Sequence, residues 1–298
     1  MVAAGPDPKL LTGVPHRDYH ADDLPGSPRF SRSAAVRILQ SPLACHAWHP
    51  KLGAVGAEDE EEQEDRAAGS LYHELLLGGG LGLAVIDHDS FRTNAAKDAK
   101  AEALANGLQP VIRAKYEAAL VHHRAIHKRL AEHGVRLVDF ETEVTALWHH
   151  GETACKSRLD ALLLAAGRIV DLKCKRVLGT LQSFERGIPA YGLDIQAYTQ
   201  RCAVEAAHPA LAGRIQHDFV VVQIVPPYDI MLVSLGPSKL SIGESRWNRA
   251  LKRWRSCLAS GQWPGVGRVP DIQAKEWELT EEMTSDAASS EPDWTKGD

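Results

Sequence analysis

The clearest pattern of apolar and polar positions lies between residues 136 and 174. Three stretches alternate between apolar and polar residues or are rich in β-branched residues, and the dipeptides His150-Gly151 and Ala166-Gly167 separate them. Short glycine-containing connections between such stretches are typical of antiparallel strands. The pattern therefore predicts an antiparallel meander with strands over 136–148, 153–164 and 168–174.

Elsewhere the periodicity is mainly helical. We expect helices over 34–39 (capped by Ser31 or Ser33), 69–77, 94–133 (interrupted near Gly107 and Pro110), 193–207 and 239–260, and a buried strand over 218–225 paired with 231–235. The order of helices, meander, helix, strands and helix predicts an α/β (α+β) domain. Its central mixed β-sheet would be flanked by helices.

Composition suggests where this domain begins and ends. Five prolines in the first 28 residues predict an extended leader over 1–28, followed by one domain over 29–270. The polar, acidic stretch 271–298 is predicted to be a disordered tail. The acidic run 58–65 is interpreted as a solvated loop.

Bulk properties exclude several classes of protein. The chain has 298 residues, 44% of them hydrophobic, a net charge of −5 and five scattered cysteines without a Cys-x-x-Cys pair. This pattern predicts neither a disulfide framework nor a zinc knuckle, and the net charge decides little about nucleic-acid binding. We find no signal peptide and no apolar run long enough to span a membrane. We therefore expect a cytoplasmic protein.

The most informative polar positions lie on the meander. Side chains alternate along a strand, so Asp171 and Lys173 share one face. If Asp160 projects onto that face from the adjacent strand, two carboxylates and an ammonium converge. Such a group can hold a divalent cation and is suited to phosphodiester hydrolysis. The alternative is a surface ion pair, but charges near a buried sheet are costly unless they are paired or bind metal.

Other residues would complete this site. Magnesium prefers six oxygen ligands, so a third acid is expected, either Glu141 or Glu143, and we favour Glu143. His73 lies on an apolar helix and is either a core residue or a neighbour of the metal. Gln196 and Tyr198 either face the sheet or point outward.

Two helices carry many basic residues. Arg113 to Arg129 would follow a phosphate backbone or form an ordinary solvated face. On the last helix, arginines and a lysine near Trp247 and Trp254 would hold DNA or an acidic neighbour.

Several blocks over 19–277 together resemble the RecE-type (exodeoxyribonuclease VIII-like) branch of the PD-(D/E)xK superfamily, a phage-type family related to lambda exonuclease. Their order and spacing make the resemblance specific. The blocks are Tyr19-His20, Ser41-Pro42, Gly69 to His73, Phe91 to Pro110, Glu143 to Trp148, Cys155 to Asp160, Asp171-x-Lys173 and Gly261 to Gly265. Two departures are Leu159, in place of the proline that names the superfamily, and Gln200, where relatives often have tyrosine.

The resemblance implies a PD-(D/E)xK restriction-endonuclease-like core over 29–270. It implies that Asp160, Asp171 and the Leu172 carbonyl are metal ligands with His73 as a metal neighbour, that Lys173 is the catalytic lysine, and that Gln196 supports the site. Together with Glu143, these are the candidate site residues.

The predicted function is a Mg²⁺- or Mn²⁺-dependent exodeoxyribonuclease acting on ends of linear double-stranded DNA. The resemblance implies 5′-to-3′ polarity, which leaves 3′ single strands for recombination with a single-strand annealing protein. It also implies a homo-oligomeric ring and, for a phage-encoded chain, the bacterial host cytoplasm. The alternatives are a non-catalytic DNA-end-binding recombination scaffold and a structure-specific or restriction-like endonuclease. A histidine-based zinc hydrolase is weaker still, because the sequence has no His-Glu-x-x-His motif.

Overall fold

The strand-like stretches of the sequence form a mixed sheet at the centre of the protein. The computed structural model describes residues 8–53, 60–78, 82–267, 273–276 and 278–280. In these residues the sheet has six strands in the order β1-β4-β5-β6-β7-β8, and only the β6–β7 pair is parallel. The strands are β1 (Lys9–Leu11), β4 (Glu141–His150), β5 (Thr153–Leu163), β6 (Arg168–Lys175), β7 (Gln216–Gln223) and β8 (Ile230–Ser234).

The meander, the helix over 193–207 and the final hairpin agree with the predicted ranges to within about five residues, whereas the helix Leu181–Tyr191 that directly follows the meander was not predicted. A smaller parallel pair, β2 (Leu83–Ile86) with β3 (Gln109–Ile112), was not predicted. The helices are α1 (His16–His20), α2 (Arg32–Gln40), α3 (Pro42–Trp48), α4 (Glu60–Leu77), α5 (Asn94–Ala105), α6 (Arg113–Glu132), α7 (Leu181–Tyr191), α8 (Leu193–Ala207) and α9 (Pro237–Ser260).

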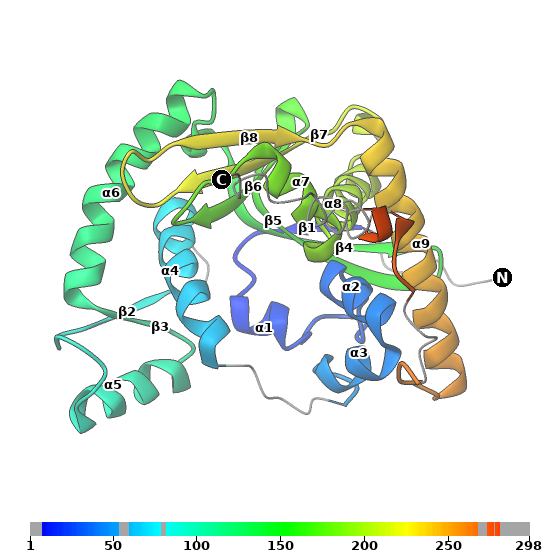
Figure 1. Cartoon of the computed structure of the whole chain (residues 1–298), viewed down its shortest axis with the longest axis horizontal. Helices are drawn as coiled ribbons and strands as arrows, with labels where there is room; N and C mark the ends of the chain where they lie inside the picture. Colours follow the sequence, from blue (N-terminus) through cyan, green and yellow to red (C-terminus); the bar gives the residue numbers. More distant parts are fainter. Residues whose placement is uncertain (1–7, 54–59, 79–81, 268–272, 277, 281–298) are drawn as a thin grey trace, which may run out of the picture. The chain divides into compact units, whose positions relative to one another are not determined.

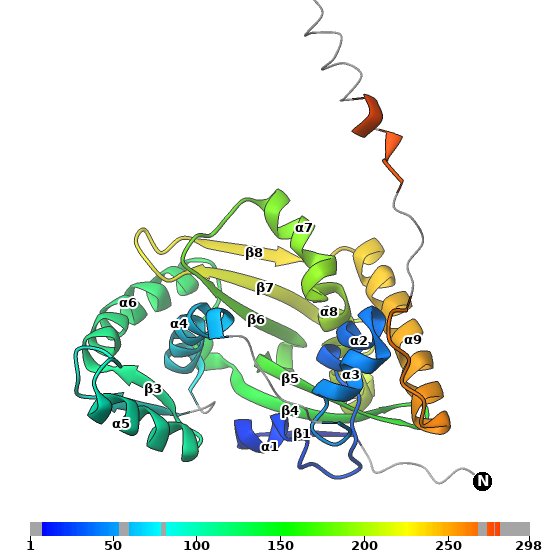
Figure 2. The same ribbon diagram turned by 60° about the horizontal axis from the view of Figure 1, so that its bottom comes forward.

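Among the described residues, two large apolar cores and a smaller cluster of Ile188, Leu193, Ala197 and Phe219 lie against the sheet. One packs α2, α8 and α9 against β4 and β5, around the fully buried Trp247 and Trp254. The other packs α4, α6 and β3 against β6 and β7. Figures 1 and 2 show α4, α5 and α6 gathered on one side and α2, α3 and α9 on the other. Burial of these apolar faces is the main stabilising contribution to the fold.

The structure differs from the sequence-based expectation at the N-terminal side. The stretch predicted as an extended leader contains β1, which pairs with β4, and helix α1. Prolines obscure the periodicity of such short elements without preventing them from packing. Residues 60–65 of the acidic run are the first turns of α4 rather than a loop, because glutamate is a good helix former and acids are favoured at a helix N-terminus.

The predicted tail over 271–298 lies largely outside the described residues. In the part of it that the structure does describe, residues 276 and 278–280 are helical. Across the described chain, no helix combines the length and apolar content needed to cross a bilayer.

Candidate active site

The pairing of β5 with β6 ends at two acids. Ala161 pairs with Val170, and the next positions in register are Asp160 and Asp171, where the ladder stops. Beyond this point β6 no longer pairs with β5. Phe30 takes its place along β5, and its N–H donates to the Ala154 carbonyl at 2.8 Å. The strands therefore separate, and a pocket of about 590 Å³ opens between them.

Side-chain alternation supplies the pocket with charged groups. The charged residues of the two strands that line it stand at alternate positions: Lys156, Arg158 and Asp160 on β5, and Lys173 and Lys175 on β6. The intervening Ser157, Leu172 and Cys174 also line the pocket. Asp171 is on the same face of β6 as these lysines and is fully buried. The sequence-based prediction that Asp160, Asp171 and Lys173 converge matches this geometry.

Glu143 occupies an irregular position on β4. Its φ of 54° lies in the left-handed region, which is unusual for glutamate within a strand. Leu159 and Ala161 of β5 are two residues apart and would normally share a face of the sheet, but they pack in different cores. The alternation of side chains along β5 therefore also shifts next to Glu143. The result is that Glu143 is buried at the pocket and ion-pairs with Arg158, whereas Glu141 is exposed. Such strain at a polar residue is common at functional sites.

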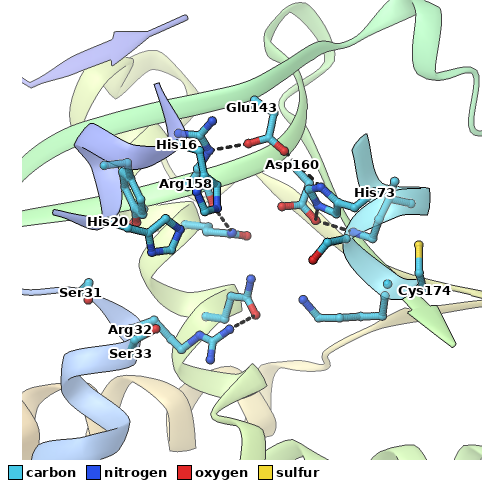
Figure 3. A pocket seen from close by; sticks show the side chains of 18 of the residues that line it. His16, His20, Ser31, Arg32, Ser33, His73, Glu143, Arg158, Asp160 and Cys174 are labelled. Carbon is cyan, nitrogen blue, oxygen red and sulfur yellow. Dashed lines mark hydrogen bonds and ion pairs between the residues drawn. The ribbon is translucent and has the colours of Figure 1, made fainter. Parts of the chain in front are cut away.

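His73 reaches the acids from α4 (Figure 3). Its Nε2 lies 3.2 Å from Asp160 Oδ2 and its Nδ1 lies 3.3 Å from Glu143 Oε1. Burial alone would lower the pKa of this imidazole, but the charges of Asp160 and Glu143 raise it to about 9. In this arrangement His73 lies between two carboxylates, whose charges favour its protonated form.

The two aspartates have opposite protonation tendencies. Burial disfavours the ionised form of Asp160, but His73, Lys173 and the Leu172 N–H, which donates to Oδ2 at 2.8 Å, together lower its pKa. Burial, and then the charge of Asp160, raise the pKa of Asp171. Like charges held this close are typical of sites that bind a cation or move a proton.

Asp171 is held from two sides. Lys173 ion-pairs with its Oδ1, and Gln196 of α8 donates to its Oδ2. Gln196 in turn accepts a hydrogen bond of 3.3 Å from Arg32 of α2. The candidate residues His73, Glu143, Asp160, Asp171, Lys173 and Gln196, with the backbone of Leu172, therefore meet at one place.

The opposite wall was not predicted as part of the site. It consists of α1 and the start of α2, and its lining residues are His16, Tyr19, His20, Ser31, Arg32 and Ser33 (Figure 3). Burial, reinforced by neighbouring cations, lowers the pKa of His16 to about 4 and that of His20 to about 3, which favours the neutral form of both at pH 7. The Tyr19-His20 block was the sequence signal for this wall.

A buried ion pair fixes this wall to β5. Lys156 Nζ lies 2.9 Å from Asp22 Oδ1 and donates to the Tyr19 carbonyl at 2.5 Å. Arg158 was also missed as a site residue, although its place two residues before Asp160 put it on the same face of the strand.

Other predicted polar residues lie elsewhere. Tyr198 faces a different cleft, where its hydroxyl donates to Glu244 at 3.4 Å. The tryptophans of α9 are core residues, and arginines near them bind groups of the protein itself. Arg246 forms a two-fold hydrogen bond to the acidic neighbour Asp194 at 2.7 and 2.8 Å, and Arg253 donates to carbonyls of α2. These contacts place Arg246 and Arg253 against the protein itself, whereas Arg249 and Lys252 of the same helix are exposed.

The acids fit a hard cation in their chemistry. No three His, Cys, Asp or Glu side chains among the described residues already surround a common point. However, the repulsion that Asp171 experiences from Asp160 is what a divalent cation would relieve. The N–H and C=O of one strand residue point to the same side, so the Leu172 carbonyl faces the gap that β5 leaves. Two carboxylates and a carbonyl are the oxygen donors that Mg²⁺ and Mn²⁺ prefer.

Comparisons with known proteins show a similarity of fold. No protein-family model matches the sequence, and no curated protein matches it. A crystal structure from Eubacterium rectale, described as a candidate exonuclease, is 13% identical, with a TM-score of 0.56 over 88% of this chain and 96% of that one. A phage-related exonuclease from Haemophilus somnus 129PT is 13% identical over 78% of this chain and 96% of that one, but its TM-score of 0.33 carries no argument. The first likeness shows the predicted restriction-endonuclease-like fold with its central mixed sheet.

Proposed function

We propose that the protein is a metal-dependent exodeoxyribonuclease that digests linear double-stranded DNA from its ends. The observation that carries the proposal is the convergence of Asp160, Asp171 and Lys173 where β5 and β6 separate, in a restriction-endonuclease-like fold. The description of the Eubacterium rectale structure as an exonuclease supports the same reaction class.

The residues divide the chemistry between them. Asp160, Asp171 and the Leu172 carbonyl would hold Mg²⁺ or Mn²⁺, which when bound neutralises charge on the scissile phosphate and lowers the pKa of a water ligand. Lys173 would position the attacking water or stabilise the additional negative charge of the transition state. Gln196 keeps the Asp171 carboxylate in place, and Glu143 holds His73 and Arg158 at the edge of the site.

The shape and charge of the pocket favour a strand end as the substrate. We infer that a DNA strand enters this pocket, which has a volume of about 590 Å³, by its end. The cationic side chains of Arg32 and Lys175 line the same pocket and would neutralise backbone phosphates, whereas Lys156 and Arg158 are ion-paired with Asp22 and Glu143. The 5′-to-3′ polarity, the production of 3′ single strands for recombination, the annealing partner and a ring-shaped homo-oligomer are proposed on the family resemblance alone.

The test compares wild type with Asp171→Ala and Lys173→Ala on end-labelled linear DNA and on closed-circular DNA. We expect Mg²⁺-dependent loss of linear DNA by wild type only, with closed circles left intact. Magnesium-dependent degradation that persists in both variants would refute this site. Cleavage of closed circles would indicate an endonuclease, and binding of DNA ends without cleavage would indicate a recombination scaffold.

A further inference from the structure

Strand β6 continues from the proposed catalytic residues to the exposed end of the pocket. Asp171, Lys173 and Lys175 occupy alternate positions and therefore share one face, about 7 Å apart. Lys175 lines the pocket at its exposed end. Lys175 is the next cation in this row after the proposed catalytic Lys173.

An exposed aromatic ring lies beside this lysine. Tyr191, the last residue of α7, is 64% exposed although it continues the apolar stripe of Phe184 and Ile188, which pack in the core. A Cβ at Gly187 would lie 3.2 Å from two atoms of the Tyr191 ring, so the ring rests on backbone that has no side chain. The Lys175 Nζ lies 5.8 Å from the ring centroid.

The position of Tyr191 is fixed relative to the proposed catalytic acids. Arg32 donates to the Tyr191 carbonyl at 3.3 Å and, through its other terminal nitrogen, to Gln196, which binds Asp171. Gly192 follows with a φ of 62°, and a Cβ there would lie 2.3 Å from the Val36 side chain. The chain between α7 and α8 is thus packed tightly against α2, and Figure 2 shows these three helices at the same end of the sheet.

We propose that Lys175 and Tyr191 form a subsite for one unpaired nucleotide next to the proposed scissile phosphate. Lys175 pairs with the neighbouring phosphate, and the free face of Tyr191 stacks on the base. Base–aromatic stacking tolerates any sequence and requires a base that is not covered by its duplex neighbour. The inference rests on the proposed function and sharpens its substrate: the strand in the site is single-stranded beyond the point of cleavage.

The exposed surface around Tyr191 favours this ligand over a purely apolar partner. Val177, two residues after Lys175, is 77% exposed, and Leu181, at the opposite end of α7 from Tyr191, is 55% exposed. They are accompanied by Lys175 and Arg176, and Arg32 lies on the pocket side. A flat ring beside cations is the combination that single-strand-binding proteins use for base and phosphate.

The test measures binding without cleavage. Single-stranded oligonucleotides carrying 2-aminopurine at successive positions from one end are titrated with wild type, Tyr191→Ala, Tyr191→Phe and Leu181→Ala in EDTA and again in Ca²⁺. We expect quenching of 2-aminopurine at one position, its loss in Tyr191→Ala with about tenfold weaker binding, and its retention in Tyr191→Phe. Leu181→Ala controls for the loss of apolar surface on the same helix and should behave as wild type.

Lys175→Ala provides a second, independent readout. We expect weaker binding and a salt dependence of log K whose slope is smaller by about 0.7, the value for one phosphate contact on a single strand. Quenching and affinity that are equal in wild type and Tyr191→Ala, or lost equally in Leu181→Ala, would overturn the subsite. If wild type still degrades linear DNA with Mg²⁺, only the subsite fails. A wild type that neither binds these oligonucleotides nor degrades DNA overturns the proposed function as well.

Discussion

Two buried aspartates on neighbouring strands have opposite surroundings. Asp218, at the start of β7, accepts hydrogen bonds from Arg168 at 2.9 Å and Ser234 at 2.6 Å, and Gln216 donates to it as well. Asp171, on β6, lies next to another carboxylate, Asp160. Although burial disfavours both anions, the hydrogen bonds lower the pKa of Asp218, whereas burial and Asp160 raise that of Asp171.

The difference separates a structural carboxylate from a functional one. A buried carboxylate whose partners all lie within the protein needs no further ligand, and removing one member of such a set destabilises the fold. A buried charge placed against its own kind costs stability, and the fold keeps it only if something else is gained. By this criterion Asp218 is an anchor of the sheet, and Asp171 belongs to the proposed site.

The largest expected effect is on activity. Asp171→Asn should abolish Mg²⁺-dependent degradation of linear DNA, because a neutral amide is a poor ligand for a hard cation. Asp218→Asn should keep the wild-type rate per folded molecule, because Asp218 does not line the pocket. Degradation rates normalised to folded protein by circular dichroism measure both. Equal losses in the two variants would contradict the separation.

The next effect is on stability. Asp218→Ala leaves Arg168, whose side chain is 19% exposed, without its carboxylate partner. Removing one partner of a buried pair costs about 3 kcal/mol, so the free energy of unfolding should fall by about that amount. Urea denaturation measures it, with the exposed Asp139→Ala as a matched control that should change little. A loss below 1 kcal/mol would show that Asp218 is not an anchor.

A smaller effect is expected where a neighbour supports Asp171. Gln196→Ala removes the amide that donates to Asp171 and accepts from Arg32. Partners of metal ligands are typically worth 10- to 100-fold in activity or metal affinity, and we expect a loss in that range. The control is Gln200→Ala, one turn along α8, whose side chain bonds to the Arg158 carbonyl and to His217 instead. Raising the Mg²⁺ concentration should restore part of the activity that Gln196→Ala loses. Any activity that Gln200→Ala loses should not respond to Mg²⁺, because Gln200 does not bind a proposed metal ligand.

Much of the fold and part of the site follow from local patterns. The period-2 alternation of the meander places Asp160, Asp171 and Lys173 on converging faces, and helix α8 agrees with its predicted range of 193–207 residue for residue. The burial of Trp247 and Trp254 could also have been anticipated, because they lie seven residues apart with Ala250 and Leu251 between them.

Other features depend on tertiary contacts that no local pattern encodes. The positive φ of Glu143 opposes the preference of its residue type, so only the surrounding sheet can impose it. The wall formed by α1 is held by the Lys156–Asp22 ion pair, which spans more than 130 residues of sequence. The placement of Tyr191 outside the core depends on where α7 ends relative to the sheet, because its spacing from Ile188 would suit a buried residue.

The smallest effect tests the sign of the two pKa shifts through the stability of the metal-free protein. The raised pKa of Asp171 means that its ionised form costs stability above the folded-state pKa, and that this cost disappears as the pH falls below the ordinary aspartate value of about 3.9. Asp171→Asn should therefore raise the free energy of unfolding at pH 7. The lowered pKa of Asp218 contributes stability that is fully present above about pH 3.9 and is lost as the pH falls through the folded value.

For this reason Asp218→Asn should lower the free energy of unfolding at pH 7, and Asp171→Asn should raise it. Both differences from wild type should become smaller towards pH 3. Urea denaturation in EDTA at pH 7, 5 and 3 measures both differences. The decisive quantity is the sign of the Asp171→Asn effect at pH 7. If Asp171→Asn stabilises the protein, Asp160 and Asp171 are held together against their mutual repulsion. If it destabilises the protein, Lys173 and Gln196 already balance the charge of Asp171 as fully as Arg168 balances that of Asp218.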